Sequence, residues 1–252
     1  MKVSPDKQLD EILLESHFGI KPATHNAAGE LLPPDYEPKA GDIFACWGSD
    51  FVSRAISLET SSLFGPSDVR FAPSHVAIAC PRWYPRDHLR CFWWESTTLT
   101  HRACLEAGRV VSGCQVHEIV DRLRDYCEAG GRVAVYRFTD FDALTEPEVN
   151  QLRTLLGQCV GDADDEERQP VTYDTAGALC CGTRIVKRFT FWRNQLDALF
   201  CSELLAAVLQ RLGRLCRENP STFTPGRLLR RLLGEGTYRL HTEFTQGDWR
   251  LE

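Results

Sequence analysis

Apolar residues recur at helical spacing in a segment late in the chain. The recurring positions are Leu204, Leu205, Val208, Leu209 and Leu212, and Gly213 follows them directly. Spacings of three and four residues place these side chains on one face of a helix, and glycine commonly follows a helix end. The pattern predicts a helix that opens at residues 200–201, buries one face and ends at Gly213.

Shorter segments rich in β-branched or aromatic residues predict strands of an antiparallel sheet. The segment around residue 117 also runs on into a helix through Asp125, which Gly130 and Gly131 end. The predicted strands are residues 42–46, 72–79, 91–96, 114–120 and 132–138, with a terminal strand from Thr237.

Helix starts are marked at two further places. A capping box with proline in its first turn begins at Thr145 and predicts a helix through Cys159. Thr224 and the proline after it predict a helix over residues 227–233. Shorter helices are expected at residues 7–17 and 51–58.

The combination of an antiparallel sheet with packed helices predicts an α+β fold. Residues 1–39 are expected to hold a helix and a proline-containing extended segment, and residues 40–252 the main domain. A chain of 252 residues is long enough to bury a substantial core without disulfides or a structural metal.

One predicted hairpin brings two chemically active side chains together. Its strands, 72–79 and 91–96, are joined by a polar segment with two prolines, and pairing about a centre near Pro85 sets His75 opposite Glu95. Side chains directly opposite each other on neighbouring strands are close enough to touch. A carboxylate beside an imidazole fixes the tautomer of the ring and stabilises its protonated form.

Cys201 falls in the opening turn of the predicted late helix. Unpaired N–H groups and the helix dipole favour an anion at that position, so a thiol there ionises more easily. The sequence thus supplies a candidate nucleophile, Cys201, a candidate base, His75, and a candidate orienting carboxylate, Glu95. The structural alternatives are that Cys201 is a buried apolar filler and that His75 is a histidine satisfied by hydrogen bonds within the hairpin.

The motifs around these residues resemble a known family. They are Gly41-Asp42-Ile43-Phe44, Ser74-His75-Val76-Ala77-Ile78, Trp94-Glu95-Ser96, Val133-Ala134-Val135-Tyr136-Arg137, Tyr173-Asp174 and Cys201-Ser202-Glu203-Leu204-Leu205. In this order, histidine first and cysteine last, they resemble the circularly permuted papain-like cysteine peptidases and amidases of the YiiX type. These are relatives of the NlpC-type cell-wall peptidases and of lecithin:retinol acyltransferase. The resemblance spans roughly residues 40–230.

The resemblance implies a permuted papain-like fold with Cys201 as nucleophile, His75 as base and Glu95 as third residue. It also assigns Tyr173 and Ser74 to substrate binding or the oxyanion site. A tyrosine that only packs in a loop is the structural alternative for Tyr173. No metal or other cofactor is expected.

Composition and charge bear on which binding partners and which cellular compartment are expected. A net charge of −6 argues against nucleic acid, and eleven cysteines without a C-x-x-C pair fit a reducing compartment. No secretory signal or transmembrane segment is expected, so the predicted location is cytoplasmic. The acidic run 162–167 is predicted to be a solvated connection rather than a calcium loop. The aromatic and basic run 187–193 could contact a membrane surface peripherally or pack beside the late helix.

The expected function is a thiol hydrolase that cleaves an amide, of peptide or isopeptide type, or an ester through an acyl-enzyme. Two alternatives stay open. One is an acyltransferase or lipid-directed thioesterase on the same scaffold, whose substrate is an acyl lipid. The other is a non-catalytic binding domain that keeps the fold.

Overall fold

The computed structural model describes residues 36–49, 57, 71–83, 89–97, 100–160 and 196–245. Within these ranges it has six strands, four α-helices and one short 3-10 helix. The strands are β1 Ile43–Trp47, β2 His75–Trp83, β3 Leu89–Thr97, β4 Gly113–His117, β5 Arg132–Phe138 and β6 Tyr238–Phe244. The helices are α3 Ile119–Glu128, α4 Glu146–Cys159, α6 Leu196–Arg211, η3 Pro220–Thr222 and α7 Pro225–Gly234.

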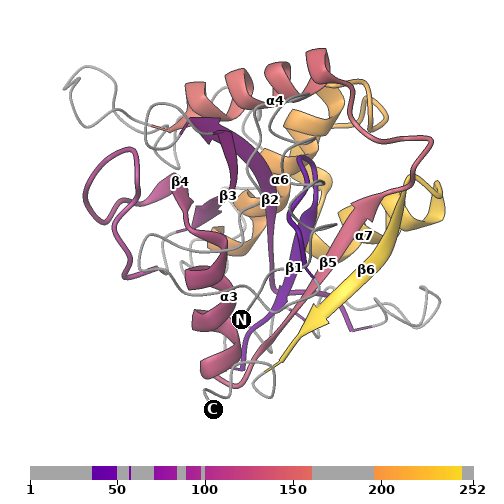
Figure 1. Cartoon of the computed structure of the whole chain (residues 1–252). Helices are drawn as coiled ribbons and strands as arrows, with labels where there is room; N and C mark the ends of the chain where they lie inside the picture. The colour runs from indigo at the N-terminus through magenta and orange to yellow at the C-terminus, as the bar shows by residue number, and fades with distance from the viewer. Residues whose placement is uncertain are drawn as a thin grey trace, which may run out of the picture.

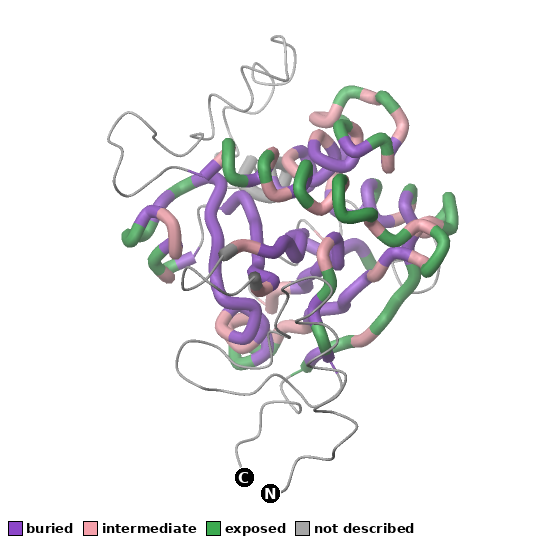
Figure 2. The backbone as a smooth tube through the Cα atoms, turned by 45° about the horizontal axis from the view of Figure 1, so that its top comes forward, coloured by how far each residue is buried: buried purple, intermediate pink, exposed green. Residues whose placement is uncertain are grey.

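The strands form one antiparallel sheet in the order β4-β3-β2-β1-β5-β6. Helices cover both faces: α4, α6 and α7 pack on one face and α3 on the other (Figure 1). The central strand β1 is buried along its whole length, whereas β6 at the edge has exposed residues (Figure 2). The predicted α+β class with an antiparallel sheet is confirmed.

Two apolar clusters fill the space between the sheet and its helices. The larger joins one face of the sheet to α4, α6 and α7, and includes Ile78, Trp94 and Leu205. The smaller joins the other face to α3, and includes Trp93 and Leu123. Because neighbouring residues of a strand point to opposite faces, Trp93 and Trp94 anchor different clusters.

The helix starts predicted at Thr145 and Thr224 are confirmed. Thr145 is the N-cap of α4 and completes a capping box with Glu148, while Thr224 caps α7 by accepting a hydrogen bond from the Arg227 N–H. In both helices proline occupies the first turn, where its missing N–H leaves no intrahelical bond unmade.

Several details of the sequence-based picture are wrong. The strand predicted over residues 114–120 ends at His117, because Ile119 and Val120 begin α3. Helix α6 begins at Leu196, so Cys201 is its sixth residue rather than part of the opening turn. In the hairpin, Ile78 pairs with Trp94, whereas the centre predicted at Pro85 pairs Ile78 with Phe92. The strands also extend to Trp83 and back from Leu89, so the connection is shorter than predicted.

Several predicted features lie outside the described residues. They are the helices at 7–17 and 51–58, most of the extended segment before residue 40, Tyr173, the acidic run 162–167 and the aromatic and basic run 187–193.

Candidate active site

The site begins with a contact between neighbouring strands. His75 is the first residue of β2 and Glu95 lies near the end of β3, and Nε2 of His75 is 2.7 Å from Oε2 of Glu95. Glu95 has no exposed surface and His75 is 7% exposed, so little water competes for this contact. The carboxylate therefore fixes the tautomer and orientation of the ring.

Cys201 reaches the same imidazole from α6. Burial alone lowers the pKa of His75, but the charge of Cys201 and hydrogen bonds to Cys201 and Glu95 raise it to about 10. Since Nε2 is bound to Glu95, Nδ1 is the ring nitrogen left to face the thiol. The ring is thus placed between a sulfur and a carboxylate, and its proton is held at neutral pH.

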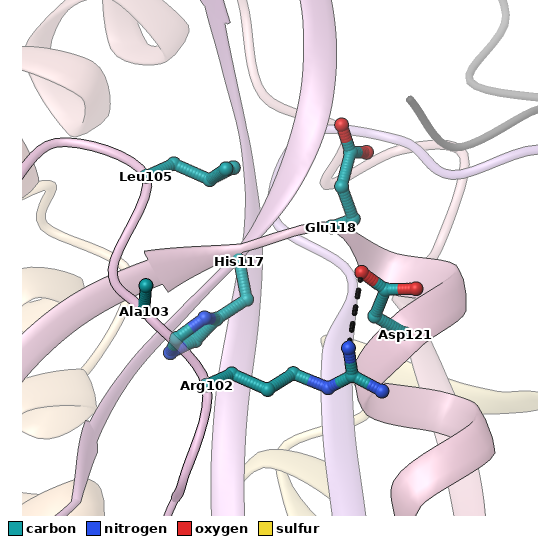
Figure 3. A pocket seen from close by; sticks show the side chains of 6 residues that line it. All are labelled: Arg102, Ala103, Leu105, His117, Glu118 and Asp121. Atoms are coloured by element: carbon teal, nitrogen blue, oxygen red, sulfur yellow. Dashed lines mark ion pairs between the residues drawn. The ribbon is translucent and has the colours of Figure 1, made fainter. Parts of the chain in front are cut away.

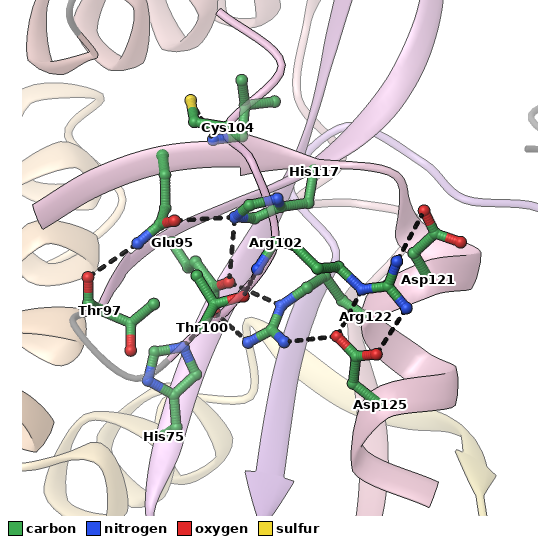
Figure 4. Close-up of polar contacts among 12 residues, drawn as sticks. His75, Glu95, Thr97, Thr100, Arg102, Cys104, His117, Asp121, Arg122 and Asp125 are labelled. Carbon is green, nitrogen blue, oxygen red and sulfur yellow. Dashed lines mark hydrogen bonds and ion pairs between the residues drawn. The ribbon is translucent and has the colours of Figure 1, made fainter. Parts of the chain in front are cut away.

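Arg122 holds Glu95 from the opposite side. This residue of α3 donates from Nε to Oε1 of Glu95 at 2.7 Å and from Nη2 to Oε2 at 3.2 Å. Although burial raises the pKa of Glu95, Arg122 and His75 together hold it well below its usual range. Figure 4 shows this series of contacts continuing from Arg122 to Asp125.

A second histidine lies close to the same carboxylate. Nε2 of His117, on β4, is 3.8 Å from Oε1 of Glu95 and 2.9 Å from Oε1 of Gln115. Gln115 donates through Nε2 to the Thr97 carbonyl, which leaves its Oε1 to accept from His117. Burial lowers the pKa of His117, so this ring is neutral at pH 7. It fills space beside Glu95 without adding a second positive charge.

Aromatic packing encloses the other side of the imidazole. The ring of Tyr126, on α3, is stacked beside that of His75 with the centroids 6.3 Å apart. Cys46, the residue paired with His75 across β1 and β2, lies beside the same ring, and burial raises the pKa of its thiol. Gly131 makes room for this packing, because a Cβ there would lie 2.5 Å from the Trp47 carbonyl oxygen and 2.9 Å from that of Tyr126.

Ser74, predicted for the substrate or oxyanion site, is part of the β1–β2 connection. Its hydroxyl donates to the Cys46 carbonyl at 3.1 Å and accepts from the Gly48 N–H at 3.2 Å. A contact from Ser74 to an oxyanion needs the bond to Cys46 to break first. Tyr173, the other predicted residue of this class, lies outside the described residues.

Cys201 lies too far into α6 for its thiol to be surrounded by the free N–H groups of the helix start. Only the first four N–H groups of a helix lack an intrahelical partner, and Cys201 follows them. The prediction that free N–H groups at a helix start surround the thiol is therefore wrong. Among the cysteines that the structure describes, Cys201 is the one whose thiol raises the pKa of His75 through charge and a hydrogen bond.

A small hollow of about 190 Å³ opens beyond the second histidine (Figure 3). It is lined by Arg102, Ala103, Leu105, His117, Glu118 and Asp121. Arg102 is already paired with Asp125 at 2.6 Å and with Asp121 at 3.4 Å. The hollow adjoins the site through His117, whose Nε2 lies 3.8 Å from Oε1 of Glu95.

The described ranges contain neither a candidate metal site nor a helix that could span a membrane. No group of three or more His, Cys, Asp or Glu side chains there is arranged to hold a metal ion. No helix in the same ranges combines the length and apolar character needed to cross a membrane.

Comparison with known proteins gives little guidance. The sequence matches no protein-family model and no curated protein. Among solved structures, the chain is similar to the crystal structure of the metalloprotein YiiX from Escherichia coli O157:H7, at 12% sequence identity and a TM-score of 0.41. The match covers 83% of this chain and 99% of that one. A TM-score this low is compatible with different folds, so function has to be argued from the site itself.

Proposed function

We propose that the protein is a cysteine hydrolase that cleaves an amide or ester bond through Cys201, His75 and Glu95. The proposal includes a permuted papain-like fold of the YiiX type, with the histidine on a strand that precedes the cysteine helix in the chain. The observation that carries it is the position of one buried imidazole between a thiol and a carboxylate.

Each residue has a defined task in the reaction. His75 takes the proton of the Cys201 thiol, and the thiolate sulfur attacks the substrate carbonyl carbon to form a tetrahedral intermediate. The carbon–nitrogen or carbon–oxygen bond then breaks, and the leaving group takes the proton from His75. The product of this half is a thioester on Cys201.

Water completes the cycle. His75 takes a proton from the water molecule, the oxygen attacks the thioester carbonyl, and the carbon–sulfur bond breaks to release a carboxylic acid. Glu95 stays ionised throughout and stabilises the imidazolium that forms in each half. In this proposal Tyr173 contributes to oxyanion binding, as the family resemblance implies.

The test is covalent labelling with an electrophilic acyl probe. A panel of fluorescent chloromethyl ketone probes, which carry a peptide, a fatty-acyl chain or a lysine side-chain amide, is incubated with the whole chain. The thiol displaces chloride to form a stable thioether, and the labelled residue is found by peptide mass spectrometry. Labelling at Cys201 that disappears in Cys201→Ala and His75→Gln is the expected result. The preferred probe also identifies the substrate class.

A reactive cysteine elsewhere has to be controlled for. Cys159 is half-buried, and the neighbouring Cys114 lowers its pKa to about 7, so it is a second candidate for labelling by thiol reagents. Cys159→Ala is therefore the matched control and should keep the Cys201 signal. Probe labelling that persists in Cys201→Ala and is lost in Cys159→Ala would contradict the proposal.

A further inference from the structure

We propose that Arg122 is a positioning residue, which holds Glu95 as a charged carboxylate in the orientation that the imidazole of His75 requires. The inference rests on the proposed function and adds a residue that no sequence motif marks. Arg122 contacts neither the thiol nor the imidazole in the hydrogen bonds described, so its effect passes through Glu95.

Arg122 and Glu95 form a bidentate contact. Nε of Arg122 donates to Oε1 of Glu95 at 2.7 Å and Nη2 donates to Oε2 at 3.2 Å. A planar guanidinium that binds both oxygens fixes the plane of the carboxylate as well as its position. Oε2 of Glu95 is thereby presented to Nε2 of His75 at 2.7 Å.

Burial makes this bidentate contact necessary. A carboxylate with no exposed surface takes up a proton unless positive charge and hydrogen bonds compensate for the lost water. Three groups that can carry positive charge face Glu95 from three elements: His75 on β2, His117 on β4 and Arg122 on α3. The Cys46 thiol on β1 and the Tyr126 phenol on α3 also lie near it, and burial raises the pKa of both. Because His117 is neutral and the charge of His75 changes during the proposed reaction, Arg122 supplies the permanent positive charge.

Arg122 is itself held in place. Its Nη1 donates to Asp125 at 2.9 Å, and its guanidinium carbon lies 5.9 Å from the ring centroid of Trp93 and 5.2 Å from that of Tyr126. Only 6% of the residue is exposed. A lysine at this position keeps the charge but cannot bind both carboxylate oxygens in one plane.

Removal of the guanidinium has a definite consequence. Without Arg122, Glu95 becomes neutral at a higher pH and then no longer stabilises the imidazolium of His75. The thiolate that pairs with this imidazolium is lost at the same point. We call the pH range over which the Cys201 thiolate signal disappears on acidification its acid limb. This limb should therefore move up by about one pH unit or more.

The experiment measures this limb directly. Thiolate absorbance at about 240 nm is recorded from about pH 4 to about pH 9, and the spectrum of a matched Cys201→Ala protein is subtracted. The difference reports Cys201 alone and needs no substrate. Arg122→Met should shift the limb upward by about one unit or more, and Arg122→Lys by less.

The control is a second forked arginine far from the site. Arg137 binds Asp42 through Nε at 2.8 Å and Nη2 at 2.7 Å, so Arg137→Met removes an equivalent pair without touching Glu95. The acid limb of Arg137→Met should coincide with that of the wild type. Where Arg122→Met does not fold, Arg122→Gln replaces it, since Gln removes the charge and keeps an N–H donor.

The outcomes separate the two proposals. A wild-type protein without any Cys201 thiolate at neutral pH would overturn the proposed function. A normal wild-type signal whose acid limb is unchanged in both neutral Arg122 variants would leave that function standing and overturn the role of Arg122. An equal shift in Arg137→Met would also overturn it, because the effect would then be one of general destabilisation.

Discussion

His75 and Glu95 are in contact although they are not directly opposite each other in the β2–β3 ladder. The observed register pairs Ile78 with Trp94 and, continued along the strands, sets Glu95 across from Ala77. His75 and Glu95 are therefore diagonal neighbours on one face, within reach of long side chains. A shift of two residues keeps both on the same face, whereas a shift of one would have separated them.

This contact predicts the effect of neutralising the carboxylate. Glu95→Gln keeps the shape of the side chain but removes the charge that stabilises the His75 imidazolium. We expect the Cys201 thiolate signal at pH 7 to fall about 10-fold or more. The free energy of unfolding should drop by about 3 kcal/mol, because Arg122 becomes a buried charge that keeps only its bond to Asp125. Difference absorbance and urea unfolding measure the two effects.

Glu118→Gln is the control for that experiment. Glu118 is also buried and pairs with Arg90 at 3.3 Å, but it does not contact His75. The Cys201 thiolate signal of Glu118→Gln should equal that of the wild type. An equal loss in both variants would show that the Glu95 contact has no special role.

The pKa values of the two histidines beside Glu95 should be shifted in opposite directions. The pKa of His75 is raised to about 10, so its imidazole stays protonated at neutral pH and its contribution to stability is fully present below pH 6.5. That contribution is lost as the pH rises through about 10. His117, whose pKa burial lowers, stays neutral at pH 7. NMR titration of the ring protons, assigned with His75→Gln and His117→Gln, checks both directions; a His75 resonance that titrates near 6.5 would contradict the account.

The start of α4 offers a prediction about the fold alone. A hydrogen bond from Arg214, with others from Thr145, lowers the pKa of Glu148 to about 2. Its contribution to stability is present above pH 4.5 and is lost as the pH falls toward 2. Glu148→Gln should therefore flatten the acid side of the profile of unfolding free energy against pH.

Thr145→Ala should lower the free energy of unfolding by about 1 kcal/mol at neutral pH, because α4 loses its N-cap. Neither change should alter the Cys201 thiolate signal, and a loss of that signal would mean that α4 is coupled to the site.

Two glycines give a matched pair of substitutions. Gly131→Ala places a methyl group against the carbonyl oxygens of Trp47 and Tyr126, and should destabilise the fold by about 2 kcal/mol or more. Gly157 lies in α4 with nothing near its missing side chain, so Gly157→Ala should stabilise by about 0.5–1 kcal/mol. Thermal unfolding measures both; equal effects would contradict the tight packing between β1 and α3.

Local patterns in the sequence predict much of this fold. The alternation in residues 132–138 and the capping residues Thr145 and Thr224 depend on nearby side chains and backbone, and the structure has these elements as predicted. The start of α6 was missed because the prediction followed the apolar positions from Leu204 onward. The start signals, Asn194 before the helix and Asp197 in its first turn, lie further upstream. The hairpin register was missed because the two prolines of residues 81–90 indicate a turn without fixing the residue at its centre.

Arg122 was missed for a different reason. Its contact with Glu95 joins α3 to β3 across 27 positions of sequence, and no local pattern reports such a pairing. One signal was present: Arg122 lies between Ile119 and Leu123 on the face of the helix that turns inward. A charged residue on an apolar helix face is a reason to look for a buried partner.

The central claim is that Cys201 and His75 form one proton-sharing pair in the folded protein. The most direct test compares the Cys201-specific thiolate absorbance at pH 7 in the wild type and in His75→Gln, each after subtraction of its Cys201→Ala counterpart. The account predicts a clear thiolate signal in the wild type and its loss in His75→Gln. A signal of equal size in both proteins, or none in the wild type, would contradict it.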